Sequence, residues 1–101
     1  MFKTVMMQEL QTAMSKEKLQ ILDVRETPEI AMGHIKGAYS LPLSQIKSKL
    51  KTLDKDVEYH VVCQSGARSF QASKILAKKG FQVVNVLGGM GSYKGPLSYE
   101  Y

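Results

Sequence analysis

This chain lacks the second cysteine that a disulfide would need, because Cys63 is the only cysteine among its 101 residues. An intrachain disulfide framework is therefore excluded. A lone thiol is typical of a reducing compartment, where the group stays available for chemistry. The two histidines, His34 and His60, do not stand at metal-ligand spacing from the cysteine or from one another. We therefore expect no metal site.

Long hydrophobic runs are also missing. No segment approaches the length of a membrane span. Residues 1–7 lack both the sustained apolar stretch and the small-residue cleavage site of a secretory signal. We expect a cytoplasmic protein without a membrane partner, and at this length one domain spanning residues 1–101.

Acidic residues are fewer than basic ones, and the net charge is +5. The lysines are spread along the chain, which is typical of solvated helix faces. Because no basic motif interleaved with aromatic residues occurs, we expect no nucleic-acid partner. A small anionic substrate fits this charge better.

The apolar residues follow strand and helix spacing in alternation along the whole chain. Strands are predicted at 3–5, 19–24, 39–41, 59–62 and 82–87. Helices are predicted around 10–14, over 43–53, from just after Cys63 to 78–80, and briefly in the tail. A further short helix is predicted with Thr27 as its N-cap and Pro28 as its first helical residue, and it ends at Gly33. Four methionines are interpreted as core residues: Met6, Met7, Met14 and Met32.

This alternation indicates an α/β fold with a largely parallel sheet. Ligands of such sheets bind beyond the carboxyl ends of the strands. Cys63 directly follows the predicted strand 59–62, and Asp23 and Arg25 stand at the end of the predicted strand 19–24. The three side chains could therefore face one crevice.

Cys63 lies in a short loop between a strand and a helix. Gly66 permits the turn, and Arg68 closes the loop. Free backbone N–H groups and the positive end of the helix dipole favour the thiolate, which is the nucleophilic form of cysteine. A cysteine in an arbitrary strand is more often a buried structural residue. The chemistry of this loop favours the nucleophile instead.

Several motifs in order resemble the rhodanese-like family. The family's N-terminal signature is matched by residues 21–25, Pro28-Glu29, 33–38 and Leu41-Pro42. Its active-site loop is matched by residues 63–69. Its C-terminal signature is matched by Gly80-Phe81, Val84 and residues 87–90. The resemblance implies a three-layer α/β fold, in which a central five-stranded parallel sheet is flanked by helices on both faces. It also implies sulfur transfer through a persulfide on Cys63, with no metal or organic cofactor.

The resemblance and the loop spacing together assign roles to the loop. The backbone N–H groups from Gln64 to Arg68 are expected to surround the persulfide; these residues are Gln64, Ser65, Gly66, Ala67 and Arg68. Arg68 could brace the loop, add positive charge, or do both. Asp23, Arg25 and Ser69 are candidates for supporting the loop from neighbouring positions. For Asp23 and Arg25, a mutual or helix-capping ion pair is the favoured interpretation.

Two residues depart from the family pattern. Gln64 stands where active members often have arginine, which bears on the choice of sulfur donor. Tyr93 stands where tryptophan is common, and we interpret this as a packing change. Neither histidine is expected to be catalytic: His34 is expected to bond loop backbone groups, and His60 to pack on its strand.

Three functional classes remain open from the sequence. The first is an enzyme that moves sulfur from a small anionic donor such as thiosulfate to a thiophilic acceptor, which is cyanide in an assay and a thiol in the cell. The second is a relay protein that receives its sulfur from a protein partner, and the third is a non-catalytic binding module, which usually lacks the cysteine. The four residues between Cys63 and Arg68 favour sulfur over phosphate, since related phosphatases have a longer loop.

Overall fold

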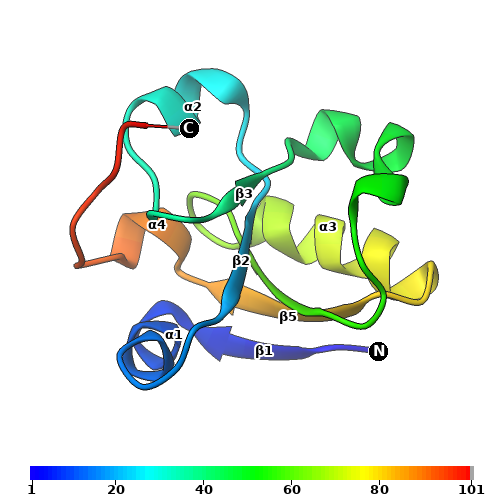
Figure 1. Cartoon of the computed structure of the whole chain (residues 1–101), viewed down its shortest axis with the longest axis horizontal. Helices are drawn as coiled ribbons and strands as arrows, with labels where there is room; N and C mark the ends of the chain where they lie inside the picture. The colour runs from blue at the N-terminus through cyan, green and yellow to red at the C-terminus, as the bar shows by residue number, and fades with distance from the viewer. Residues whose placement is uncertain (101) are drawn as a thin grey trace.

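The computed structural model describes residues 1–100. Its sheet contains β1 (Lys3–Met6), β2 (Gln20–Asp23), β3 (Tyr39–Ser40), β4 (Glu58–Val62) and β5 (Gln82–Leu87). The strands lie in the order β1-β5-β4-β2-β3, and all neighbours are parallel (Figure 1). The helices are α1 (Met7–Met14), α2 (Thr27–Ala31), α3 (Ala67–Lys78) and α4 (Gly89–Ser92). None of the helices within residues 1–100 is both long and apolar enough to cross a membrane.

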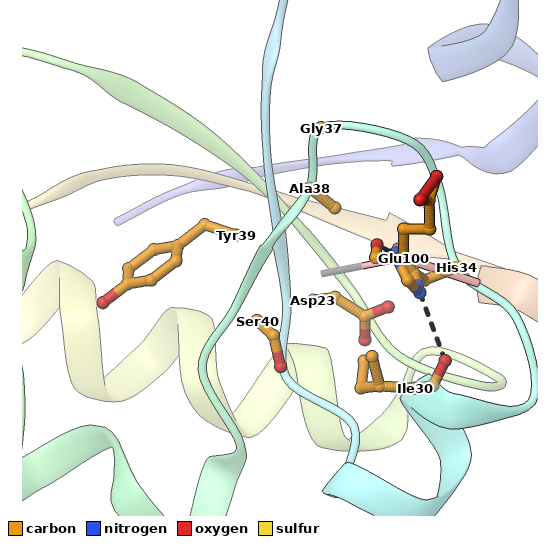
Figure 2. A pocket seen from close by; sticks show the side chains of 8 residues that line it. All are labelled: Asp23, Ile30, His34, Gly37, Ala38, Tyr39, Ser40 and Glu100. Atoms are coloured by element: carbon orange, nitrogen blue, oxygen red, sulfur yellow. Dashed lines mark hydrogen bonds between the residues drawn. The ribbon is translucent and has the colours of Figure 1, made fainter. Parts of the chain in front are cut away.

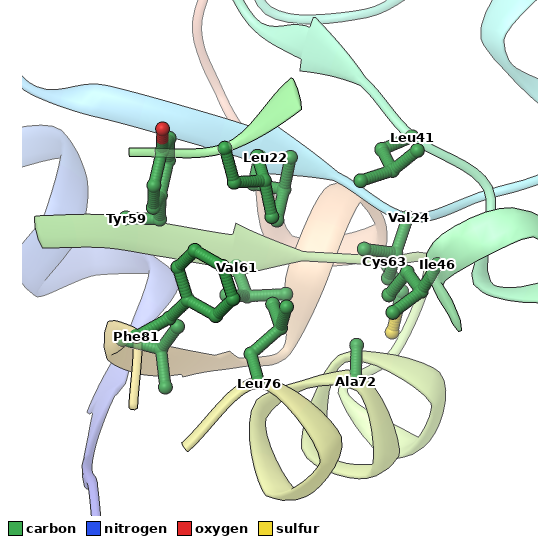
Figure 3. Close-up of a cluster of buried hydrophobic side chains, with 12 residues drawn as sticks. Leu22, Val24, Leu41, Ile46, Tyr59, Val61, Cys63, Ala72, Leu76 and Phe81 are labelled. Carbon is green, nitrogen blue, oxygen red and sulfur yellow. The ribbon is translucent and has the colours of Figure 1, made fainter. Parts of the chain in front are cut away.

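Two apolar clusters cover the two faces of the sheet. On one face α3 packs against β4 and β5, and the larger cluster includes Cys63, Ala72 and Leu76 (Figure 3). On the other face α1 contributes Met7 and Leu10 to a smaller cluster, which α4 and its flanks extend. The predicted five-stranded parallel sheet with helices on both faces is confirmed. The carboxyl end of β4, a strand inside the sheet, presents Cys63.

The prediction of one helix over 43–53 is wrong in type. Two 3₁₀ helices occupy the region, η1 (Leu43–Ser48) and η2 (Leu50–Thr52), and Lys49 between them has non-helical φ and ψ angles of −124° and 24°. The Ser48 hydroxyl donates to the Gln45 carbonyl, and the Thr52 hydroxyl donates to the Lys49 carbonyl. Such local bonds compete with α-helical hydrogen bonding. The apolar spacing still places Ile46 and Leu53 in the core.

Two smaller predictions also need correction. The N-cap of α2 is Glu26 rather than Thr27, and Pro28 lies in the first turn. Met7 is buried and Met14 packs against the smaller cluster, as predicted. Met6 and Met32 are exposed to 49% and 79%, so they are not core residues. Met32 is exposed because it follows directly after α2. With only five residues, α2 is too short for the spacing of its apolar residues to define a buried face.

The turn after β5 is bonded to the Cys63 loop. The backbone N–H groups of Gly88, Met90 and Gly91 donate to the carbonyls of Ser65, Cys63 and Gln64, at 2.9, 2.8 and 2.9 Å respectively. Gly89 has a φ of +51°, and a Cβ there would collide with the Cys63 carbonyl oxygen. Glycine therefore permits both the turn and its close approach to the loop.

We expect Gly89→Ala to lower the free energy of unfolding by about 3 kcal/mol, since it combines left-handed strain with overpacking against backbone. Gly37→Ala is the matched control, because Gly37 also has positive φ but no heavy atom within 4 Å of the added Cβ. Gly37→Ala should lower the free energy of unfolding by about 1 kcal/mol. Urea unfolding of both variants measures the difference. Equal losses in the free energy of unfolding would show that close packing of the turn against the Cys63 loop does not disfavour a side chain at position 89.

Candidate active site

Cys63 stands between β4 and α3, with its side chain fully buried. Figure 3 shows its sulfur on the α3 side of the sheet, beside Ala72. The Gly66 N–H donates to the Cys63 Sγ at 3.0 Å, which Gly66 achieves with a φ of +122°. The Ser69 Oγ lies 3.5 Å from the same sulfur. The nucleophile predicted from the sequence therefore lies in a loop that directs polar hydrogens at it.

The environment of Cys63 favours the thiolate. Burial acts to raise the pKa of the thiol, but hydrogen bonds from the Ser69 hydroxyl and from the N–H groups of Ser69, Gly66 and Ser65 outweigh it. The pKa therefore lies below its ordinary value, so a larger share of thiolate is present at neutral pH.

Ser69 connects the sulfur to the surrounding backbone. The thiol donates to the Ser69 Oγ, and the Ser69 hydroxyl donates to the Gly66 carbonyl, with 3.1 Å between the two oxygens. When Cys63 loses its proton, the Ser69 hydroxyl can turn and donate to the sulfur, because a hydroxyl is both donor and acceptor. Ser69 thus has an acceptor for its proton in either state of the cysteine.

Arg68 is bonded to a carboxylate from a distant part of the chain. Its two terminal nitrogens donate to the two carboxylate oxygens of Glu29, at 2.5 and 2.8 Å. This bidentate bond is the main reason that the pKa of Glu29 falls to about 2, and it raises the pKa of Arg68. The pair joins α2 to the first turn of α3, across the loop that carries Cys63.

Sequence reasoning assigned no role to Glu29. The carboxylate lies 39 residues from Arg68, so no local spacing connects the two. The only available signal was its place in the Pro28-Glu29 motif. Arg68, by contrast, was identified from its position at the end of the loop.

Asp23 and Arg25 form a buried ion pair with one another, at 2.9 Å. The Arg25 guanidinium also donates to the carbonyls of Glu29 and Gly33, at 3.4 and 2.9 Å. These bonds hold α2 at its middle residue, Glu29, and at Gly33 just beyond its end, and Glu29 is also the partner of Arg68. The geometry favours the mutual ion pair over a direct contact between Asp23 and the loop.

Gln64 is exposed and borders a cleft of about 360 Å³ beside the Cys63 loop. The cleft is lined by Arg25, Glu29, Met32, Gly33, Gln64, Met90 and Leu97. Its walls come from the α2 segment, the turn after β5 and the C-terminal segment. Gln64, the residue next to the candidate nucleophile, is therefore in a position to contact a bound molecule.

A second cavity of about 320 Å³ is lined by Asp23, His34 and Glu100 among others (Figure 2). The His34 Nδ1 and Nε2 atoms lie 3.2 and 2.7 Å from the carbonyl oxygens of Ile30 and Glu100. The His34 ring therefore bonds backbone groups as predicted, although one of them, the Ile30 carbonyl, belongs to α2 rather than to a loop. Within residues 1–100, no group of three potential ligands could hold a metal ion.

His60 lies on β4, partly buried, and its burial is the main cause that lowers its pKa. Its Nδ1 atom has no hydrogen-bond partner among the described residues. These features agree with the prediction that His60 packs on its strand.

Comparisons with known proteins agree with this geometry. Residues 6–95 match the model of the Rhodanese-like domain family. The chain is 43% identical over 93 residues to the Bacillus subtilis protein named "Putative sulfurtransferase YtwF", covering 86% of this chain and 90% of the relative. It is 39% identical over 82 residues to the B. subtilis "Putative sulfur carrier protein YrkF", covering 80% of this chain and 44% of that protein. A rhodanese-like domain protein from Staphylococcus aureus has the same fold, with a TM-score of 0.92 at 33% identity over 99% of this chain and 100% of the other.

Replacing Ser69 with alanine should raise the pKa of Cys63, because the thiolate loses a donor while its burial remains. Ser73→Ala is the control, since Ser73 is buried one turn further along α3 and its hydroxyl has no partner among the described residues. The rate of iodoacetamide alkylation as a function of pH reports the thiolate fraction. Ser69 would have no role in stabilising the thiolate if both variants gave the wild-type profile.

Proposed function

The chain belongs to the rhodanese-like domain family, and from this membership we propose that it is a sulfurtransferase that carries sulfane sulfur as a persulfide on Cys63. The family match and the names of its relatives support sulfur transfer in general. The observation that carries the specific proposal is the Gly66 N–H bonded to a buried Cys63 sulfur in a loop of four residues. A reducing compartment such as the cytoplasm would keep this thiol available.

The reaction has two displacement steps. The Cys63 thiolate attacks the outer sulfur of a donor such as thiosulfate, the sulfur–sulfur bond of the donor breaks, and sulfite leaves with the electron pair. An acceptor thiolate, or cyanide in an assay, then attacks the terminal sulfur of the persulfide. The bond to the Cys63 Sγ breaks, and the Cys63 thiolate is restored.

The loop would stabilise the anionic persulfide through its backbone. N–H groups of Gln64, Ser65, Gly66, Ala67 and Arg68 are proposed to face the terminal sulfur, as the Gly66 N–H already faces the Sγ. Arg68 acts mainly as a brace, because its guanidinium is bonded to Glu29. Its charge adds to the favourable field at the cysteine.

A relay protein that is loaded by a partner desulfurase is the second candidate. It is favoured by Gln64, which offers a small anion only neutral hydrogen bonds, and by the similarity to a relative named as a sulfur carrier. Both candidates require the same loaded Cys63, and they differ in the donor.

Thiosulfate treatment should add one sulfur atom to the intact mass of the protein, and dithiothreitol should remove it. Cys63→Ser should show no such adduct, because a hydroxyl does not accept a sulfane sulfur. Failure of thiosulfate, with loading by a desulfurase, would select the relay candidate. Failure of every sulfane donor while Cys63 can still be alkylated would contradict both candidates.

Gln64→Arg should lower the KM for thiosulfate by about tenfold, if one charge-assisted contact contributes about 1.4 kcal/mol to donor binding. The kcat should change less, since the contact already forms in the bound ground state. Steady-state kinetics with thiosulfate and with a neutral organic persulfide test this, because only the anionic donor should gain. An unchanged KM for thiosulfate would show that Gln64 does not set donor preference.

A further inference from the structure

The C-terminal segment forms part of the cleft beside the Cys63 loop, although residues 96–100 lie beyond the family match at 6–95. Two backbone hydrogen bonds of 2.9 and 2.7 Å pair Ser98 with His34 in an antiparallel bridge. The Tyr93 hydroxyl donates to the Pro96 carbonyl at 2.9 Å. The segment is therefore anchored on both sides of Leu97.

Leu97 is held against Gly33 at the edge of this cleft. A Cβ on Gly33 would lie 2.9 Å from the Leu97 Cδ1, so the contact depends on the missing side chain. The Leu97 side chain nevertheless remains 44% exposed, and Met32 in the same cleft is 79% exposed. With Met90, these residues form an apolar wall that borders Gln64, the neighbour of the nucleophile.

The two arginines near this wall are each paired with a carboxylate. Arg25, which lines the cleft, pairs with Asp23, and Arg68 pairs with Glu29. The described lining residues therefore include no unpaired cation for an inorganic oxyanion. A neutral, apolar surface is complementary in charge to an uncharged apolar partner, whose burial against the wall would be favourable.

We propose that Leu97 is a specificity-determining residue, which together with Met32 and Met90 selects an acceptor cysteine flanked by apolar side chains on a peptide or protein. This inference rests on the proposed function and names the acceptor class of that site. In the transfer step, the acceptor thiolate attacks the terminal sulfur of the Cys63 persulfide, and the bond to the Cys63 Sγ breaks. The acceptor leaves as a persulfide, and no further oxidant or reductant is needed.

The test uses full-length protein whose Cys63 has first been loaded with thiosulfate or polysulfide and verified by intact mass. The acceptors are two acetylated and amidated tripeptides with a central cysteine, one flanked by leucines and one by serines. Single-turnover rates are measured at acceptor concentrations below saturation. The ratio of the leucyl rate to the seryl rate gives the preference for the leucyl peptide. Wild-type protein should prefer it about fivefold to tenfold, since part of the apolar wall becomes buried.

Leu97→Asn should reduce this preference about fivefold, by lowering the rate with the leucyl peptide more than the rate with the seryl peptide, whereas Leu97→Met should retain the preference. Phe70→Asn is the matched control, because Phe70 is exposed to a similar extent as Leu97 but packs against Phe2 and does not line the cleft. Met32→Asn changes a more exposed side chain and should also lower the preference, which covers the case in which Leu97→Asn does not fold.

The two levels of the proposal fail in different ways. Absence of any loaded persulfide overturns the proposed function. A loaded protein that transfers sulfur to both peptides equally, or whose preference survives both Leu97→Asn and Met32→Asn, overturns the role of Leu97 and leaves sulfur transfer intact.

Discussion

The packing of two backbone segments at the carboxyl edge of the sheet determines the site. The carbonyls of Cys63, Gln64 and Ser65 all accept hydrogen bonds from the turn after β5. With these carbonyls held from one side, the loop presents backbone N–H groups to the Cys63 sulfur, and the Gly66 N–H makes that contact. Gly89 is the residue that permits this approach, because any side chain there would displace the Cys63 carbonyl.

Two opposing physical effects act on the pKa of the Cys63 thiol. Cys63 belongs to the apolar cluster under α3, and burial alone would keep it protonated. Local donors outweigh this effect and lower the pKa of the thiol, although the sulfur lies in a place that water does not reach easily. A low-dielectric surrounding also strengthens each of these hydrogen bonds, which suits the proposed anionic sulfur. The same burial restricts access to Cys63, so the walls around the loop can determine which molecules react.

Much of the fold could be predicted because its signals are local. An apolar run predicts β4, Gly66 predicts the turn of the Cys63 loop, and an amphipathic repeat predicts α3. The prediction was wrong for 43–53, since apolar spacing alone does not distinguish an α-helix from two 3₁₀ helices when hydroxyl side chains bond to nearby carbonyls. The prediction of burial was also wrong for Met6 and Met32, whose apolar side chains suggest burial but whose positions leave them at the surface.

The sequence by itself determined the family, the parallel α/β fold and the identity of the candidate nucleophile, because each depends on short motifs and spacings and on their order along the chain. Only the tertiary structure decided which groups surround that nucleophile. Glu29 reaches Arg68 from 39 residues away, and Leu97 reaches the α2 segment through a bridge between Ser98 and His34. Such contacts depend on how separate elements dock on the sheet, and no periodicity within a single element encodes that docking.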